Sequence, residues 1–167
     1  ADAPSPDPVR ISPSAIPNAS PQDDAAPGFR LFDYQAEGVR LLGGLKAGLM
    51  ADEMGVGKTA TAIAWAATKR PVLVITPASI VYNWEKEIKK NWRRNDSVQI
   101  VSLDKPFMER LPDWTICSYG QVQNLLPELR SAGFRTLLID EAHNLRNLEA
   151  QRTKNIAAIV EPDKPLS

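Results

Sequence analysis

Short continuous apolar runs alternate along this chain with stretches whose apolar residues follow a helical period. A strand that is buried on both faces of a parallel sheet is expected to read as such a run. The segments 71–76 and 135–139 fit this description, and two further short strands are predicted at 98–101 and 115–118. Each is short, as strands are, and the first is rich in β-branched residues.

The segments between these runs predict helices. Trp84, Ile88 and Trp92 recur every four residues, which marks the buried face of a helix, and Pro77 suits its first turn. Further helices are expected near residues 57–69, 120–129 and 149–160. Alternating strands and helices predict an α/β fold, in which a parallel sheet is flanked by helices on both faces in three layers.

The first part of the chain has a different composition. Residues 1–28 contain seven of the fourteen prolines, which rules out a packed helix or a central strand there. We interpret 1–28 as a linker, or as a strap lying over the domain. From residue 29 the pattern becomes periodic, with a helix expected at 33–42 and a strand near 47–50, so the folded domain is predicted to span 29–167.

Composition and charge limit the possible functions. Twenty basic and twenty acidic residues give a net charge of zero, so no global charge attracts nucleic acid, and any such contact must be local. The single cysteine, Cys117, excludes an internal disulfide framework and fits a reducing compartment,. No apolar run approaches the ~18 residues of a membrane span, and no membrane partner is expected.

Residues 52–59, DEMGVGKT, are the clearest candidate for chemistry. A glycine-bearing turn that opens a helix directs backbone N–H groups at one point, where the helix dipole adds positive potential, so phosphate binds there. The backbone of Gly55, Val56 and Gly57 would form this cradle. Lys58 would reach the outer phosphates, and the Thr59 hydroxyl would ligate Mg²⁺. The segment therefore predicts a nucleotide P-loop.

A second motif follows the last predicted strand. Asp140 and Glu141 come directly after the apolar run that ends at Ile139, and ligands of open α/β sheets bind at the carboxyl ends of strands. Asp140 can hold the Mg²⁺ that bridges the phosphates. Glu141 can orient or deprotonate the attacking water. Together the two motifs predict a Mg·ATP site with Lys58, Asp140 and Glu141 as its catalytic residues.

The order of these motifs resembles the Swi/Snf-type ATPases of helicase superfamily two, which are DNA translocases that include chromatin remodellers. The segment 31–39 (LFDYQAEGV) is similar to the family's adenine-recognising helix, and DEMGVGKT has aspartate where other P-loops have their first glycine. Segments 76–87 and 118–119 resemble the next two motifs, and DEAH at 140–143 resembles the family's Walker B segment. The resemblance covers roughly residues 29–167.

The resemblance implies a RecA-like P-loop lobe and further site residues. Gln35 would read the adenine edge, while Thr76, Ser79 and Ser118 would contact the DNA backbone. Duplex DNA and a second RecA-like lobe in cis, which carries the arginine finger, are the implied partners. The chain would then be the amino-terminal lobe, cut short of the coupling motif. By itself it should hydrolyse ATP barely or not at all.

Other functions remain open at this point. The same motifs occur in RNA helicases and restriction-type translocases, and a docking module could keep the fold without catalysis. A P-loop kinase fits less well, because it needs neither the tandem Asp140-Glu141 nor Gln35. An intracellular location is expected. The short connections between motifs favour a bacterial or viral member, in the cytoplasm or nucleoid, while a eukaryotic member would be nuclear.

Overall fold

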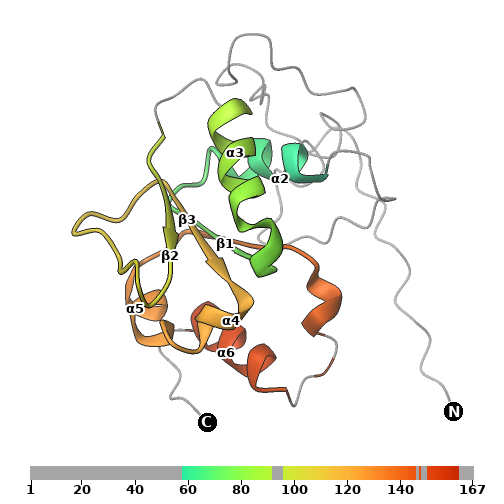
Figure 1. Cartoon of the computed structure of the whole chain (residues 1–167), viewed down its shortest axis with the longest axis vertical. Coiled ribbons are helices and arrows are strands. Elements are labelled where there is room, and N and C mark those ends of the chain that lie inside the picture. The colour runs from blue at the N-terminus through green and yellow to red at the C-terminus, as the bar shows by residue number, and fades with distance from the viewer. Residues whose placement is uncertain (1–57, 92–95, 146, 148–149, 162–167) are drawn as a thin grey trace, which may run out of the picture.

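The computed structural model describes residues 58–91, 96–145, 147 and 150–161. The centre of this part is a four-stranded sheet in the order β2-β3-β1-β4 (Figure 1). All neighbouring strands are parallel. The strands are β1 (Val72–Thr76), β2 (Val98–Val101), β3 (Trp114–Ser118) and β4 (Thr136–Ile139). The predicted parallel α/β architecture is therefore confirmed for the described residues.

Strand β1 explains why its sequence is apolar at every position. All five of its residues are buried, because it lies between β3 and β4 and is covered on both faces. Val72 and Val74 belong to one apolar core, whereas Leu73 and Ile75 belong to the other. Successive side chains of a strand point to opposite faces of the sheet, so this one strand supplies both cores.

The helices divide between the two faces of the sheet (Figure 1). Helices α2 (Lys58–Ala66) and α3 (Val81–Asn91) cover one face, and the single-turn η2 (Ala78–Ile80) leads into α3. The other core is built around α4 (Tyr119–Val122), α5 (Leu126–Ser131) and α6 (Gln151–Val160). On α3, Val81, Trp84 and Ile88 are buried, which confirms the predicted inner face of that helix at these positions.

The single helix predicted at 120–129 was wrong. Two short helices, α4 and α5, occupy this stretch and are separated by a turn. Leu125 precedes α5 with φ −110° and ψ 13°, and Pro127 lies in the first turn of α5. Proline has no N–H to continue an earlier helix, but it fits the start of a new one. The break therefore follows from Pro127.

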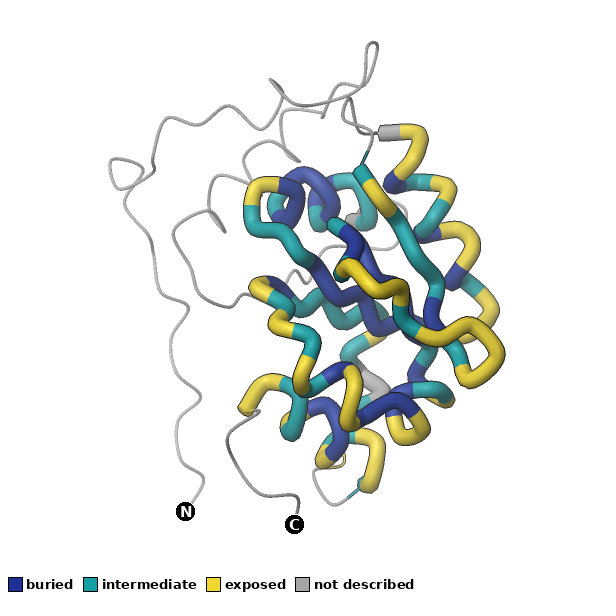
Figure 2. The backbone as a smooth tube through the Cα atoms, turned by 90° about the vertical axis from the view of Figure 1, so that its left-hand side faces the viewer, coloured by how far each residue is buried: buried dark blue, intermediate teal, exposed yellow. Residues whose placement is uncertain are grey.

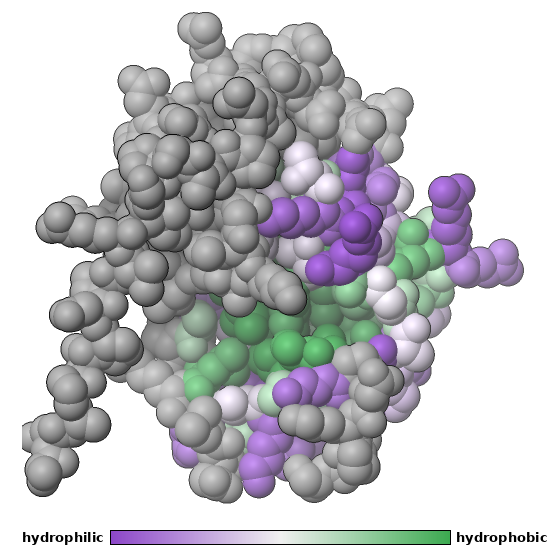
Figure 3. All heavy atoms as spheres, turned by 180° about the vertical axis from the view of Figure 1, so that it is seen from behind, coloured by the Kyte–Doolittle hydropathy of each residue, from purple (hydrophilic) through white to green (hydrophobic). Residues whose placement is uncertain are grey.

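Burial follows the sheet and the inner faces of the helices (Figure 2). Seen from behind, apolar side chains gather across the middle of the surface, with polar side chains around them (Figure 3). The described residues include no helix with the length and apolar character needed to cross a membrane. The helix predicted at 33–42 and the strand near 47–50 lie outside the described residues, as does the leader 1–28.

Candidate nucleotide-binding site

Asp140 lies where two neighbouring strands end. Its backbone N–H donates to the carbonyl oxygen of Ile75 at 2.9 Å, which extends the β1–β4 ladder by one residue beyond the pair Ile75 and Ile139. Thr76, the last residue of β1, therefore lies next to Asp140 at the carboxyl edge of the sheet. Ligands of open α/β sheets bind at this edge.

Two side chains hold the carboxylate of Asp140. The indole N–H of Trp84 donates to Oδ2 at 2.7 Å, and the Thr76 hydroxyl lies 3.2 Å from the same oxygen. Both partners are enclosed, with Trp84 4% exposed and Thr76 fully buried. Because both bonds reach Oδ2, the other oxygen, Oδ1, carries neither of them. These two bonds thus fix the orientation of the Asp140 carboxylate.

Glu141 has an unusual backbone. Its φ is +55°, in the left-handed region that a side chain other than glycine, asparagine or aspartate adopts at a cost of about 1–2 kcal/mol. The Tyr119 hydroxyl donates to the carbonyl oxygen of Asp140 at 2.6 Å and so fixes the peptide that precedes Glu141. The side chain of Glu141 is exposed. Strain of this kind concentrates at functional sites.

The two ligands predicted for the metal, Asp140 and Thr59, offer the oxygen atoms that Mg²⁺ prefers. The described residues contain no group of three or more His, Cys, Asp or Glu side chains that could hold a metal ion. Mg²⁺ is usually bound by one or two carboxylates together with phosphates and water. Asp140 can supply one such carboxylate, and the Thr59 hydroxyl remains the other predicted ligand.

The P-loop is described only from its last two residues. Helix α2 begins at Lys58, and Thr59 is its second residue, half-buried. The helix packs against β4 and α3, so the P-loop helix adjoins the strand that ends just before Asp140. The predicted contacts of Gly55, Val56, Gly57 and Gln35 lie outside the described residues, as does the side chain of Lys58.

Comparison with known proteins decides the family. The family model of the SNF2-related domain matches residues 34–164, which is most of the chain. This chain belongs to the SNF2-related domain family. The match includes both the P-loop segment and the Asp140-Glu141 segment, and it confirms the resemblance seen in the order of the motifs.

Curated relatives place this SNF2-related domain among much longer proteins. It is 33% identical over 146 residues to "Helicase swr-1" of Neurospora crassa, covering 75% of the chain and 8% of that protein. It is also 33% identical over 138 residues to "ISWI chromatin-remodeling complex ATPase ISW2" of Saccharomyces cerevisiae, with coverage of 71% and 12%. The chain thus spans about a tenth of their length. These relatives are eukaryotic and give no support to a bacterial or viral source.

Solved structures confirm the fold class. The SNF2-related domain superposes on the "Sulfolobus solfataricus SWI2/SNF2 ATPase core domain" with a TM-score of 0.70 and 26% identity, over 89% of this chain and 32% of that one. The same core "in complex with dsDNA" matches with a TM-score of 0.67 and 28% identity, over 76% of this chain and 29% of that one. The RecA-like lobe predicted from the motifs is therefore shown.

The three predicted nucleic-acid contacts have different surroundings in this SNF2-related domain. Thr76 is fully buried and its hydroxyl bonds to Asp140, which is the geometry of a support for the carboxylate, and the DNA contact predicted for it stays a prediction. Ser79 is exposed in η2, before α3. Ser118 is half-buried at the residue before α4 and makes no side-chain capping bond there. Ser79 and Ser118 stay predictions.

Trp84 and Tyr119 are site residues that sequence reasoning missed. Trp84 was expected on a buried helix face and within the motif-like segment 76–87, and Tyr119 as part of the motif at 118–119, but neither was given a role at the site. The signal that could have found them is polarity, because a buried indole or phenol needs a partner for its polar hydrogen. Asp140, at the nearest strand end, was the available acceptor.

Tyr119 gives a first testable prediction. Burial, reinforced by the negative charge of Asp140, raises the pKa of Tyr119 from 10.0 to about 12. The stabilisation is complete below pH 10 and is lost as the pH rises towards 12, since the unfolded phenol ionises first. We expect Tyr119→Phe to lower the free energy of unfolding by about 0.5–1.5 kcal/mol at neutral pH. The difference from the unsubstituted protein should shrink above pH 10.

Urea unfolding at pH 7 to 11.5 measures this difference. Cys117, whose pKa burial also raises to about 12, is present in both proteins and cancels. Tyr82→Phe is the matched control, because Tyr82 is 65% exposed and its substitution should leave the profile unchanged. A Tyr119→Phe difference that stays constant across this pH range would contradict the prediction.

Proposed function

We propose that the chain is the ATP-binding and hydrolysing lobe of an SNF2-type DNA translocase. The observation that carries the proposal is the carboxylate of Asp140, held at the carboxyl edge of the sheet by Trp84 and Thr76 beside the strained Glu141. A purely structural domain has no need for an oriented carboxylate and an exposed glutamate at this edge, next to a helix that begins with Lys58 and Thr59,.

Each residue has a role in this proposal. The loop 55–57 and the start of α2 cradle the phosphates, and Lys58 neutralises charge on the outer ones. Thr59 and Asp140 would hold Mg²⁺, which would neutralise the charge that develops on the phosphates. Glu141 orients a water molecule and accepts its proton. Gln35 recognises the adenine.

Hydrolysis needs groups that this lobe does not supply. In P-loop NTPases an arginine finger is worth about 10³–10⁵ in rate, and we assign that group to a second lobe in cis. The chain alone should therefore bind nucleotide and turn it over barely or not at all. Duplex DNA across the two lobes is the proposed stimulus, supported by the dsDNA complex of the archaeal core. The protein would then be located with chromosomal DNA.

Lys58→Ala tests the proposal at the nucleotide. The variant removes a charged hydrogen bond to phosphate, worth about 1.5–3 kcal/mol, so we expect the dissociation constant for Mg·ATP to rise about 10- to 100-fold. Calorimetry or a fluorescent ATP analogue measures it. Lys89→Ala is the control, because Lys89 is an exposed lysine that pairs with Glu85 at 2.7 Å and should leave binding unchanged.

The alternatives predict other results. Equal binding by the Lys58→Ala variant and the unsubstituted chain would contradict a P-loop. No binding by either would favour a docking module with the same fold. In a protein that joins the chain to a second lobe, stimulation of hydrolysis by RNA but not by duplex DNA would indicate an RNA helicase.

A further inference from the structure

The bond from Trp84 to Asp140 joins two segments 56 residues apart. An indole N–H can only donate, so at 2.7 Å it fixes which carboxylate oxygen faces the helix. Trp84 is 4% exposed, and a bond in such surroundings competes little with water. The ring therefore defines the orientation of the carboxylate.

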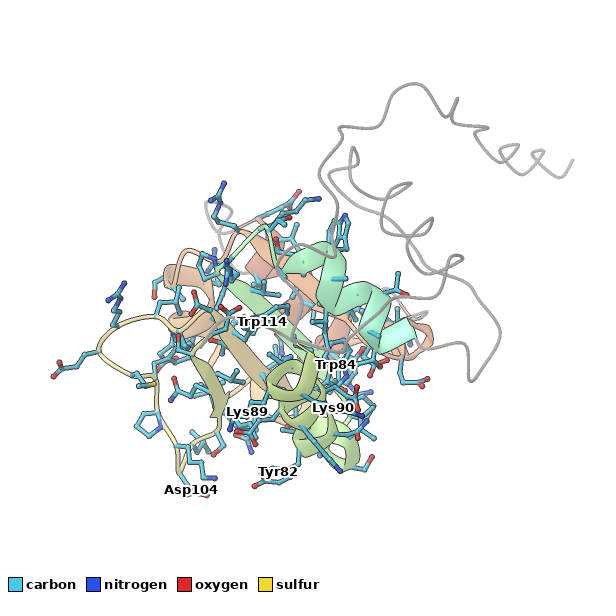
Figure 4. All side chains as sticks on the ribbon, turned by 90° about the horizontal axis from the view of Figure 1, so that it is seen from above. Tyr82, Trp84, Lys89, Lys90, Asp104 and Trp114 are labelled. Carbon is cyan, nitrogen blue, oxygen red and sulfur yellow. The ribbon has the colours of Figure 1, made fainter. Side chains whose placement is uncertain are left out.

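The ring of Trp84 is itself held by the core. It shares one apolar cluster with Ile63 and Ala64 of α2 and with Val74 of β1. Figure 4 shows Trp84 on the side of α3 that faces α2, while Tyr82 points away from the domain. Trp84 thus belongs to the core that includes the P-loop helix, while its indole bonds to the Asp140 carboxylate.

We propose that Trp84 is a positioning residue for the metal-binding carboxylate, an inference that rests on the proposed function. By occupying Oδ2, together with Thr76, it leaves Oδ1 to the metal and prevents the carboxylate from rotating. Partners that orient a metal ligand in this way typically contribute 10- to 100-fold to metal affinity or activity. Asp140 is the residue that touches the metal, and Trp84 acts through it.

The helix that carries Trp84 also contacts an exposed segment. Helix α3 packs against η2, where Ala78 and Ser79 are exposed. Ser79 is one of the predicted contacts for a nucleic-acid backbone. A ligand that moves η2 and the start of α3 would also move Trp84, and with it the orientation of Asp140.

A second tryptophan offers a matched control. The indole N–H of Trp114 donates to Oδ2 of Asp96 at 3.0 Å, and Trp114 is also fully buried. Asp96 pairs in addition with Arg70. Trp114 begins β3, at the opposite end of that strand from Ser118. Trp84→Phe and Trp114→Phe therefore make the same chemical change, near and away from the candidate site.

The experiment measures how much Mg²⁺ each protein needs to bind ATP. We expect Trp84→Phe to raise the half-saturating Mg²⁺ concentration about 10-fold or more, while ATP binding without metal stays within about twofold. Trp114→Phe should stay within about twofold in both measurements. If Trp84 has only a structural role, both substitutions should change the half-saturating Mg²⁺ concentration alike, or Trp84→Phe should also change ATP binding without metal. Either result would overturn the proposal.

The outcome is separable from the proposed function. If the unsubstituted chain shows no binding of ATP that depends on Mg²⁺ and Lys58, the proposed function fails. If it binds as expected and Trp84→Phe matches Trp114→Phe, only the role of Trp84 fails.

A measurement on the unsubstituted chain does not depend on any variant folding. The four tryptophans give four indole N–H signals in a ¹H–¹⁵N spectrum, and the two Phe variants assign those of Trp84 and Trp114. Should either variant not fold, selective exchange and contacts to neighbouring side chains assign them instead. Adding Mg²⁺ with ADP should move the Trp84 signal and leave that of Trp114 in place. An unmoved Trp84 signal at saturating nucleotide would overturn the proposal.

Discussion

Replacing Asp140 with alanine is expected to abolish Mg²⁺-dependent nucleotide binding and also to destabilise the fold. The indole N–H of Trp84 and the hydroxyl of Thr76 would lose their common acceptor. Each buried donor left unpaired costs about 1–3 kcal/mol, and both side chains are enclosed. Urea unfolding measures the second effect, and calorimetry with and without Mg²⁺ measures the first.

Asp140→Asn separates the two effects. An amide oxygen can still accept from the indole, so the free energy of unfolding should fall less than in the alanine variant. The lost negative charge should still remove most of the metal affinity. Thermal or urea curves that coincide for Asp140→Ala and the unsubstituted chain would show that these hydrogen bonds do not hold the site together.

A double-mutant cycle between Trp84→Phe and Asp140→Ala assigns the energy to the pair. Residues in direct contact show interaction energies of about 0.5–3 kcal/mol, whereas distant residues are additive to within about 0.5 kcal/mol. Trp114→Phe combined with Asp140→Ala should be additive, because Trp114 donates to Asp96.

Much of the described fold could be predicted from the sequence, because the central strands β1 and β3 are buried along almost their whole length. Residues such as Leu73 and Val74 occupy opposite cores, so every position must be apolar, and the run itself marks the strand. The place of Asp140 followed from the same logic, since it directly follows a strand. Continuous burial of a strand thus produces a continuous apolar run in its sequence.

The parts that could not be predicted depend on pairs of residues far apart in the chain. Nothing near Trp84 in the sequence indicates that its indole meets Asp140, and nothing near Thr76 shows that its hydroxyl points inward. The break between α4 and α5 is different, because Pro127 was a signal for it in the sequence. Backbone strain at Glu141 has no signal in a sequence that places glutamate there.

Glu141 provides the clearest separation of stability from function. Its φ of +55° is a conformation that asparagine tolerates better than glutamate. We expect the free energy of unfolding of the Glu141→Asn variant to equal that of Glu141→Gln or to exceed it by up to about 1 kcal/mol. Both substitutions remove the carboxylate, so their difference reports the backbone alone. A position selected for stability would not carry this strain.

The same two variants should lose catalysis together. Removing a general base typically costs about 10²–10⁴ in rate, so hydrolysis should fall by that factor in a protein that joins the chain to a second lobe. Binding of Mg·ATP to the chain should stay within about threefold, because Glu141 is assigned to water and not to phosphate. If Glu141→Gln kept its rate, the proton would have to go elsewhere, and the strained backbone would need another explanation.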